Sequence, residues 1–255
     1  MELSTLVSRL DDRLDTADYA DVDASANGLQ VGPAEKTVDH VAFAVDGVEE
    51  TFERAAGQGA DLLVVHHGIV WGGLDRVTGL EYGRLRSLLQ NDVALYVAHL
   101  PLDGHPEFGN AAGLADRLEI PETEPFAMLN GQPIGRRGRL ETPLTTDSLH
   151  SRVADSLPVD TGDVRVLDHG PDRIEDVAVV TGSGADFLRE AADAGVDAFV
   201  TGEAKQKIYH EAREAGVSVL LAGHYTTETV GVRALQSLVA NWGPETTFIE
   251  AATGL

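Results

Sequence analysis

The spacing of apolar residues along the chain alternates between a helical period and the continuous runs typical of buried strands. Residues 4–14 carry Leu6, Leu10 and Leu14 at helical spacing, which predicts an amphipathic helix. Residues 62–65 are all apolar, as in strands that are buried on both faces. The other elements predicted in this half are strands at 38–45 and 93–98 and helices at 48–58 and 84–90. Strands that alternate with helices predict an α/β fold with a largely parallel sheet.

A proline-containing stretch interrupts this pattern near the middle of the chain. Residues 121–133 contain three prolines and show little periodicity. The pattern then restarts, with elements predicted at 138–140, 146–156, 164–166, 177–181, 187–194, 198–201, 208–215 and 217–222. We therefore predict one domain over residues 1–125 and another over 126–255, with a C-terminal helix that can pack back on the first domain.

The two halves resemble each other. Aligning residues 55–64 with residues 191–200, an offset of 136, gives five matches in ten positions. His99 and His224 each end a predicted strand, and each has a carboxylate four residues later, Asp103 and Glu228. Helix–glycine–strand units share some likeness by chance, but these paired endings favour an internal duplication.

Candidate ligands gather where the predicted strands end, which is where open α/β sheets bind ligands. They are His66, His67, His99, Asp103, His224 and Glu228. Adjacent strand residues point to opposite faces, so His66 and His67 can share a site only if the chain turns, and Gly68 permits that turn. Imidazole and carboxylate ligands suit Zn, Fe, Mn, Ni or Co. This many ligands exceeds the need of one tetrahedral ion and suffices for two. The alternative is a set of unrelated structural histidines.

Composition narrows the class of protein. The 255 residues include 42 acidic and 19 basic ones, for a net charge of −23, and 43% are hydrophobic. That hydrophobic content excludes a disordered acidic tail, and the charge disfavours nucleic acids and anionic membranes as partners. Cysteine is absent, which excludes thiolate sites, and no apolar run approaches the ~18 residues of a membrane span. We expect a cytoplasmic protein.

The acidic residues are spread along the chain, and sixteen of the 19 basic residues are arginine. This distribution fits either an ordinary acidic protein or adaptation to a salt-rich cytoplasm, which we favour because salt screens self-repulsion.

Three further features each have two readings. His210 belongs either to a pocket or to an exposed helix face. Residues 182–184, Gly-Ser-Gly, form either an anion cradle or a tight turn. Arg136, Arg137 and Arg139 either meet a phosphate group or form a solvated strand edge.

Taken in order, the motifs resemble the family of GTP cyclohydrolase I type 2 homologs, also called Nif-three-like proteins. The resemblance covers nearly the whole chain. It rests on Asn27-Gly28-Leu29-Gln30-Val31, Val65-His66-His67-Gly68 with Trp71, His99-Leu100-Pro101-Leu102-Asp103-Gly104-His105-Pro106 with Gly109-Asn110, Thr201-Gly202-Glu203 with His210, and Gly223-His224-Tyr225 with Glu228. Residues 203–207 depart from the family pattern, which weakens any role for His210.

The resemblance implies two similar α/β domains that face each other across a cleft containing two divalent metal ions. Its implied metal ligands are His66, His67, Asp103, His224 and Glu228. It also implies a homohexamer, built as a trimer of dimers.

We therefore expect a metal-dependent hydrolase, similar to a GTP cyclohydrolase, that acts on a nucleotide or a related small metabolite. Asp103 and Glu228 are the candidates for bridging carboxylates, and His99 would orient a ligand or carry a proton. Two alternatives stay open. One is a non-catalytic metal-binding protein, such as a metal chaperone or regulatory protein, and the other is a scaffold with a vestigial site.

Overall fold

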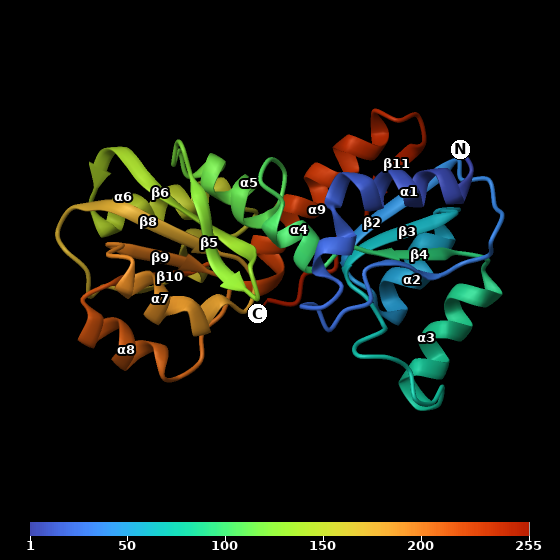
Figure 1. Ribbon diagram of the computed structural model, residues 1–255, viewed down its shortest axis with the longest axis horizontal. Helices are drawn as coiled ribbons and strands as arrows, with labels where there is room; N and C mark the ends of the chain where they lie inside the picture. The colour runs from blue at the N-terminus through green and yellow to red at the C-terminus, as the bar shows by residue number, and fades with distance from the viewer. Residues whose placement is uncertain (255) are drawn as a thin grey trace. The chain divides into compact units, whose positions relative to one another are not determined.

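The computed structural model describes residues 1–254, for Thr161 only the backbone, and it divides into two compact units (Figure 1). The first unit comprises Met1–Leu102 and Val232–Ala251, and the second comprises Asp103–Gly231 and, of the described residues that remain, 252–254. Each unit has helices on both faces of a sheet, as Figure 1 shows. The predicted α/β fold class is therefore confirmed.

The first unit contains a five-stranded sheet with the order β1-β4-β3-β2-β11. Strands β2, β3, β4 and β11 run parallel, and β1 pairs with β4 in the antiparallel sense. The strands are β1 (Gly28–Val31), β2 (His40–Asp46), β3 (Leu62–His67), β4 (Ala94–Val97) and β11 (Glu245–Phe248). The helices are α1 (Leu3–Leu14), η1 (Thr16–Tyr19), α2 (Glu49–Gly57) and α3 (Gly79–Gln90). Two further helices, α4 (Leu100–Gly104) and α9 (His224–Ala240), contain residues of both units.

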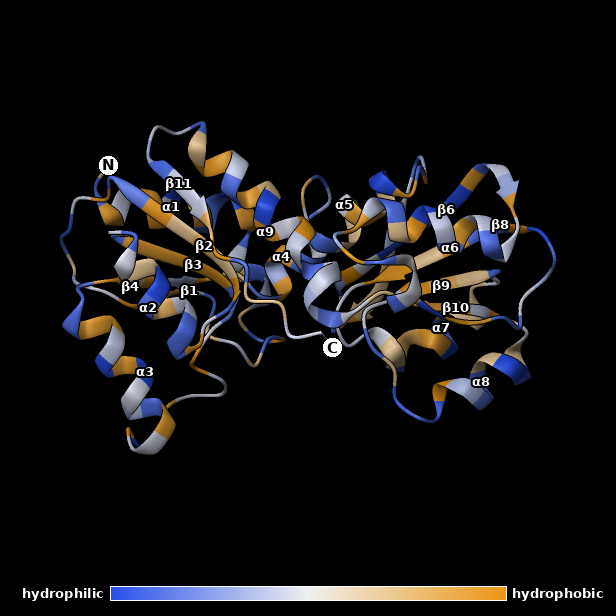
Figure 2. Ribbon diagram, turned by 180° about the vertical axis from the view of Figure 1, so that it is seen from behind, coloured by the Kyte–Doolittle hydropathy of each residue, from blue (hydrophilic) through white to orange (hydrophobic). Residues whose placement is uncertain are grey.

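The predicted amphipathic helix forms as α1, because its leucines at helical spacing are almost fully buried. The opposite face of the sheet packs against α2 and α3, where Phe52 and Leu88 join strand residues such as Leu63 and Leu95 in one core. Figure 2 shows the apolar residues concentrated on the central strands. Burial on both faces explains why β3 reads as an uninterrupted apolar run.

The second unit contains a six-stranded sheet with the order β5-β6-β8-β9-β10-β7. Strands β8, β9 and β10 run parallel, whereas β5, β6 and β7 pair in the antiparallel sense. The strands are β5 (Glu124–Leu129), β6 (Gln132–Leu144), β7 (Arg165–Leu167), β8 (Ile174–Val180), β9 (Ala198–Thr201) and β10 (Ser218–Leu221). The helices are α5 (Asn110–Arg117), α6 (Thr146–Ser156), η2 (Thr161–Asp163), η3 (Gly184–Phe187), α7 (Leu188–Asp193) and α8 (Ile208–Ala215).

The unit boundary lies earlier than predicted. The sequence placed it between residues 125 and 126, but the structure places it after Leu102. The reason is α5, whose Ala111 and Leu114 pack in the core of the second unit. The chain later returns to the first unit, where β11 pairs with β2.

The two sheets repeat one arrangement at the offset found in the sequence. Val41 pairs with Leu62 in the first unit, and Val177 pairs with Ala198 in the second. Both pairs are related by 136 residues. In each sheet an antiparallel strand also lies beside the third parallel strand, β1 beside β4 and β7 beside β10. The shared strand order and register support the internal duplication.

A matched aspartate has the same role in both halves. A carboxylate oxygen of Asp61 accepts hydrogen bonds from the backbone N–H groups of residues 39 and 40, at 2.9 and 3.1 Å. Asp197, 136 residues later, accepts from residues 175 and 176 at 2.8 and 3.0 Å. Each aspartate thereby fixes the start of the first parallel strand of its sheet.

No helix within residues 1–254 combines the length and the apolar character that crossing a membrane requires.

We expect Asp61→Ala and Asp197→Ala each to lower the free energy of unfolding by about 1–3 kcal/mol, because each change leaves two backbone donors without their charged acceptor. Chemical denaturation of the two variants measures this loss. Asp12→Ala, at an exposed position of α1, is the control and should stay within about 0.5 kcal/mol of the parent protein. If either aspartate variant behaves like this control, the bonds do not stabilise that sheet.

Candidate metal centre

Three histidines meet at the strand ends of the first unit. His66 and His67 are the last residues of β3, and His99 follows the neighbouring strand β4. One ring nitrogen from each lies within 4.8 Å of the others. The ring centroids of His66 and His67 are 4.7 Å apart, and those of His66 and His99 are 5.0 Å apart. The structure therefore places His99 as a third nitrogen donor beside the two histidines that the sequence proposed as ligands.

The turn after His67 requires a glycine. A Cβ at Gly68 would lie 2.5 Å from a methyl group of Val97 and 2.6 Å from the side-chain oxygen of Gln30. That oxygen accepts hydrogen bonds from the N–H groups of Ile69 and Val70, at 2.9 and 3.1 Å. Gln30 thus holds the turn by which two adjacent histidines reach one site, which gives the Asn27–Val31 motif a structural role.

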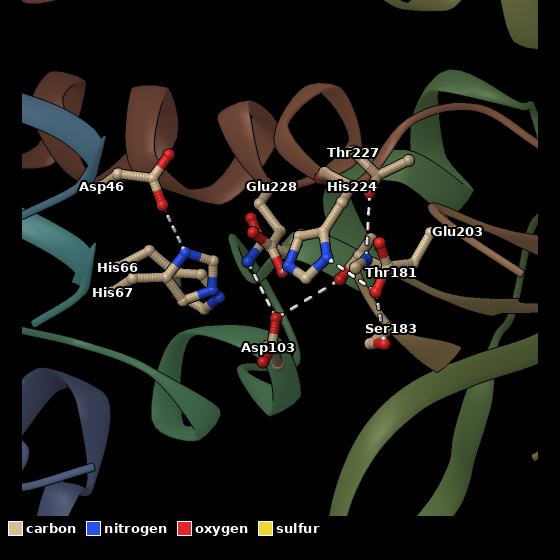
Figure 3. A network of polar contacts seen from close by, with 12 residues as sticks. Asp46, His66, His67, Asp103, Thr181, Ser183, Glu203, His224, Thr227 and Glu228 are labelled. Carbon is tan, nitrogen blue, oxygen red and sulfur yellow. Dashed lines mark hydrogen bonds and ion pairs between the residues drawn. The ribbon is translucent and has the colours of Figure 1, made fainter. Parts of the chain in front are cut away.

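Each of the three rings has an oxygen acceptor at Nδ1. His66 donates from Nδ1 to the carbonyl of Ala98 at 2.8 Å. The Nδ1 atoms of His67 and His99 lie 2.8 Å from carboxylates of Asp46 and Asp23, and Figure 3 shows the Asp46 contact. A proton on Nδ1 places the lone pair on Nε2, which is the arrangement found behind metal-binding histidines.

Asp23 organises the loop around His99. One of its oxygens accepts from His99 and from Ser25 N–H, and the other accepts from the side chain of Asn27 and from Leu100 N–H. Asn27 in turn accepts from the N–H of His99 at 2.7 Å. Burial alone would raise the pKa of Asp23, but these bonds outweigh burial and lower the pKa, so the carboxylate stays charged.

A carboxylate-rich group occupies the strand ends of the second unit. Glu228 Oε1 lies 3.0 Å from Nε2 of His224, and oxygens of Glu228 and Asp103 lie within 4.8 Å of each other. Asp103 accepts hydrogen bonds from Asn110, the first residue of α5, at 2.8 Å and from Thr181, which follows β8, at 3.3 Å. Figure 3 shows the contact with Thr181. The structure thus places three predicted ligands, Asp103, His224 and Glu228, in the second unit, although the sequence assigned Asp103 to the first domain.

His224 lies between two carboxylates. Its Nδ1 is 3.4 Å from Glu203, which also accepts a hydrogen bond from Ser183 at 2.6 Å. The hydrogen bond to Glu228, opposed by burial and assisted by both negative charges, raises the pKa of His224 to about 9 in the metal-free protein. The bond from Ser183 lowers the pKa of Glu203. Ser183 thus joins the Gly182–Gly184 segment to the carboxylate beside His224.

Gly182 lets Glu228 approach the end of β8. A Cβ at this position would lie 2.1 Å from Glu228 Oε1 and 3.1 Å from His224 Nε2. The residue also has a φ of +58°, a conformation that side chains disfavour. Only glycine fits both demands, so Gly182 helps define the position of the glutamate.

The donor set fits divalent metal ions. The first unit offers imidazole nitrogens with oxygen acceptors behind them, and the second offers two carboxylates and one imidazole. These nitrogen and oxygen donors suit Zn and its neighbours in the first transition series.

Sequence reasoning gave no role in the site to the residues behind the rings, Asp23, Asp46 and Glu203, although Glu203 belongs to the Thr201-Gly202-Glu203 motif. Asp46 ends the parallel strand β2 and Glu203 follows the parallel strand β9, so the rule that named the ligands could also have named these two residues. Asp23 gives no such signal, because its partner His99 is 76 residues away. His210 lies exposed on α8 against Tyr209, and the structure describes no bond from it to the site.

We expect an NMR titration of the metal-free protein to give His224 a pKa of about 9, and Glu228→Gln to lower that pKa, because the strongest bond to the imidazolium is weakened. Since the folded pKa exceeds the ordinary 6.5, the pair stabilises the fold fully below about pH 6.5 and loses this contribution as pH rises through about 9. An unchanged pKa in Glu228→Gln would contradict the contact.

Gly182→Ala should also lower the pKa of His224, because the added methyl group displaces Glu228. The matched control is Gly195→Ala, which has a φ of +75° but nothing within 4 Å of its added Cβ. Both variants carry backbone strain, so an equal effect in the two would argue against the close approach at Gly182. The same histidine titration measures both.

Comparison with known proteins identifies the family. Residues 1–254 match the family model Duf34/NIF3 (NGG1p interacting factor 3). The chain is 57% identical over its full length to the full-length GTP cyclohydrolase 1 type 2 homolog of Halobacterium salinarum, and 44% identical, again over both full lengths, to that of Pyrococcus abyssi.

Solved structures agree. Protein ybgI, of unknown function, superposes with a TM-score of 0.91 at 35% identity, and TTHA1606 from Thermus thermophilus superposes with 0.89 at 37%, each over 100% of both chains. These matches bear out the resemblance read from the motifs: the chain belongs to the Duf34/NIF3 family, whose curated members here are named GTP cyclohydrolase 1 type 2 homologs.

Proposed function

We propose that this protein binds two divalent metal ions and uses them to hydrolyse a small metabolite, with nucleotides as the first class to test. The ligands are His66 and His67 of the first unit and Asp103, His224 and Glu228 of the second. The observation that supports this most directly is the oxygen acceptor at Nδ1 of each histidine in the first unit, which directs Nε2 lone pairs to one place.

The chain's own residues have separable roles in this proposal. Asp46 holds His67, and Asp23 holds His99, each through Nδ1. His99 then presents a basic Nε2 beside the ligands, where it can take a proton from water or return one to a leaving group. Asp103 and Glu228 have two oxygens each and are the candidates for bridging. When bound, the metal ions supply a water molecule of lowered pKa and polarise the group under attack.

The relatives' shared name supports hydrolysis as the reaction class, since it refers to a cyclohydrolase, though as a homolog. Assembly as a homohexamer, suggested by the family resemblance, stays a prediction.

The metal proposal predicts that the parent protein, purified without added metal, contains two divalent ions per chain. Asp103→Ala should lose at least one of them, because the change removes a ligand. Asp116→Ala, at an exposed position of α5, should keep both. Elemental analysis of the three proteins, with thermal unfolding to verify that each is folded, measures the effect. If Asp103→Ala and the parent hold the same metal, the ligand assignment is wrong.

Activity is the second part of the same experiment. Metal-loaded protein is assayed for hydrolysis of nucleotides, pterins and dinucleotides, and any hit is repeated with Glu228→Gln and with Asp116→Ala. Loss of the hit in Glu228→Gln alone attributes it to the proposed centre. Two bound metals with every coordination position filled by protein, and no turnover, would instead indicate a non-catalytic metal-binding protein.

A further inference from the structure

Trp71 is an exposed aromatic side chain beside the histidines of the first unit. It is 44% exposed, and its ring centroid lies 4.9 Å from that of His99 and 6.3 Å from that of His67. Solvent also reaches these two histidines, since 18% of the His99 side chain and 20% of the His67 side chain are exposed, whereas His66 is fully buried. The three partly exposed rings therefore form one accessible aromatic surface within the first unit.

Two sets of bonds hold Trp71 in place. Its indole N–H donates to the carbonyl of Gly68 at 3.0 Å, so the ring is oriented by the same turn that brings the histidines together. Its backbone forms an antiparallel bridge with Ser25, and the N–H of Gly72 donates to the carbonyl of Ala24 at 2.7 Å. The indole is thus ordered before any ligand binds, and a contact with it requires little further ordering of this side chain.

Exposure alone does not single out this tryptophan. Leu80 and Leu89 on α3 are more exposed, and isolated apolar side chains of that kind are common on protein surfaces. Trp71 differs because hydrogen bonds fix it and because its ring contacts that of His99. Tryptophan is a mostly buried residue in folded proteins, so an ordered indole left open beside a candidate site is suited to receive a partner.

The ring geometry leaves a face of the indole for such a partner. The planes of Trp71 and His99 meet at 78°, an edge-to-face arrangement. Whichever of the two rings supplies the edge, at least one face of the indole is not covered by His99. Planar heteroaromatic rings stack on aromatic side chains, and this contact tolerates many different rings because each has a π-face. A molecule stacked there lies next to His67, a proposed ligand, and His99, a proposed proton carrier.

Stacking also fits the charges around the histidines. The carboxylates behind them belong to Asp23 and Asp46, and the whole chain has a net charge of −23, so recognition through an anionic group is opposed. The arginines near the start of β6 do not offset this, because Arg137 and Arg139 pair with carboxylates and Arg136 is buried in the second unit. An indole face, by contrast, binds a neutral ring without any of these cations.

We propose that Trp71 is the surface on which a planar heteroaromatic ring of the substrate stacks, next to the histidines of the first unit. The proposal rests on the proposed function for the reaction that this molecule undergoes, and it narrows the substrate to compounds that contain such a ring. Stacking itself requires neither metal nor turnover, so the two ideas fail separately.

The tryptophans of the chain make stacking measurable. There are two, Trp71 and Trp242, and the guanidinium of Arg9 lies 4.2 Å from the ring centroid of Trp242. The full-length Trp242→Phe variant keeps only Trp71, and we expect inosine and uridine to quench its indole fluorescence saturably, both as purified and after metal removal. Ribose, which lacks the ring, should not quench. Trp71→Phe, in which only Trp242 remains, should show no saturable quenching.

Affinity, measured by ligand-detected NMR, gives a second readout. Trp71→Leu should weaken inosine binding by about 5- to 150-fold, because the stacking surface is lost while an apolar side chain remains. Trp71→Phe should weaken it less, because an aromatic face is kept. Tyr82→Leu is the matched control, since it removes another exposed ring, on α3, and should bind inosine as the parent does. Elemental analysis should find the parent's metal content in all three variants.

Three outcomes would overturn the proposal. No saturable quenching of Trp71 by either nucleoside would show that the indole face takes no ring. Equal inosine binding by Trp71→Leu and the parent would place any bound ring elsewhere. A lower molecular mass in Trp71→Leu, without nucleoside binding by the parent, would indicate that Trp71 contacts another subunit. Failure of the metal experiment alone leaves the stacking result standing, and hydrolysis that is unchanged in Trp71→Leu would leave the proposed function standing without this contact.

Discussion

The site depends on one interaction, the contact between Nδ1 of each histidine and an oxygen behind it. For the three histidines of the first unit the oxygens belong to Ala98, Asp46 and Asp23, and each contact decides which ring nitrogen carries the lone pair. His224 has a carboxylate at each ring nitrogen, Glu203 at Nδ1 and Glu228 at Nε2. Without it, adjacent rings at a strand end would be free to rotate and to exchange tautomers. The sheets supply the geometry, because the ends of neighbouring parallel strands bring the ring and its oxygen to the same edge.

Much of this could be predicted because the relevant signals are local. Apolar runs such as residues 62–65 predict buried strands, and the histidines at the ends of these strands could therefore be placed at one edge of the sheet. The offset of 136 residues was visible as matched letters, and it reappears as equal strand register. One of the matched residues has the same structural role in both halves: Asp61 and Asp197 each accept backbone hydrogen bonds at the start of the corresponding strand. The sequence pattern was sufficient to predict those features that depend on residues close together in the chain.

The remainder depends on contacts between distant parts of the chain. Asp23 reaches His99 across 76 residues, and the approach of Glu228 to Gly182 joins segments that no spacing rule connects. Of the long strand β6, the sequence predicted only residues 138–140, because the prolines at 125 and 133 obscured the alternation of apolar and polar residues around it. A turn signal was present, since Asn130 and Gly131 both have positive φ between β5 and β6. The unit boundary was misplaced for the related reason that α5 follows a loop yet packs on the second core.

The return of the chain to its first sheet has a consequence for biosynthesis. Strand β11 supplies the edge beside β2, yet it leaves the ribosome after every strand of the second sheet. The second sheet, by contrast, has all of its strands once β10 has emerged. The second unit can thus complete the hydrogen bonding of its sheet while β2 of the first unit still has an unpaired edge. Unpaired strand edges can pair with the wrong segment or with another chain. During synthesis the second sheet would then be completed before the first, although the first sheet begins earlier in the chain.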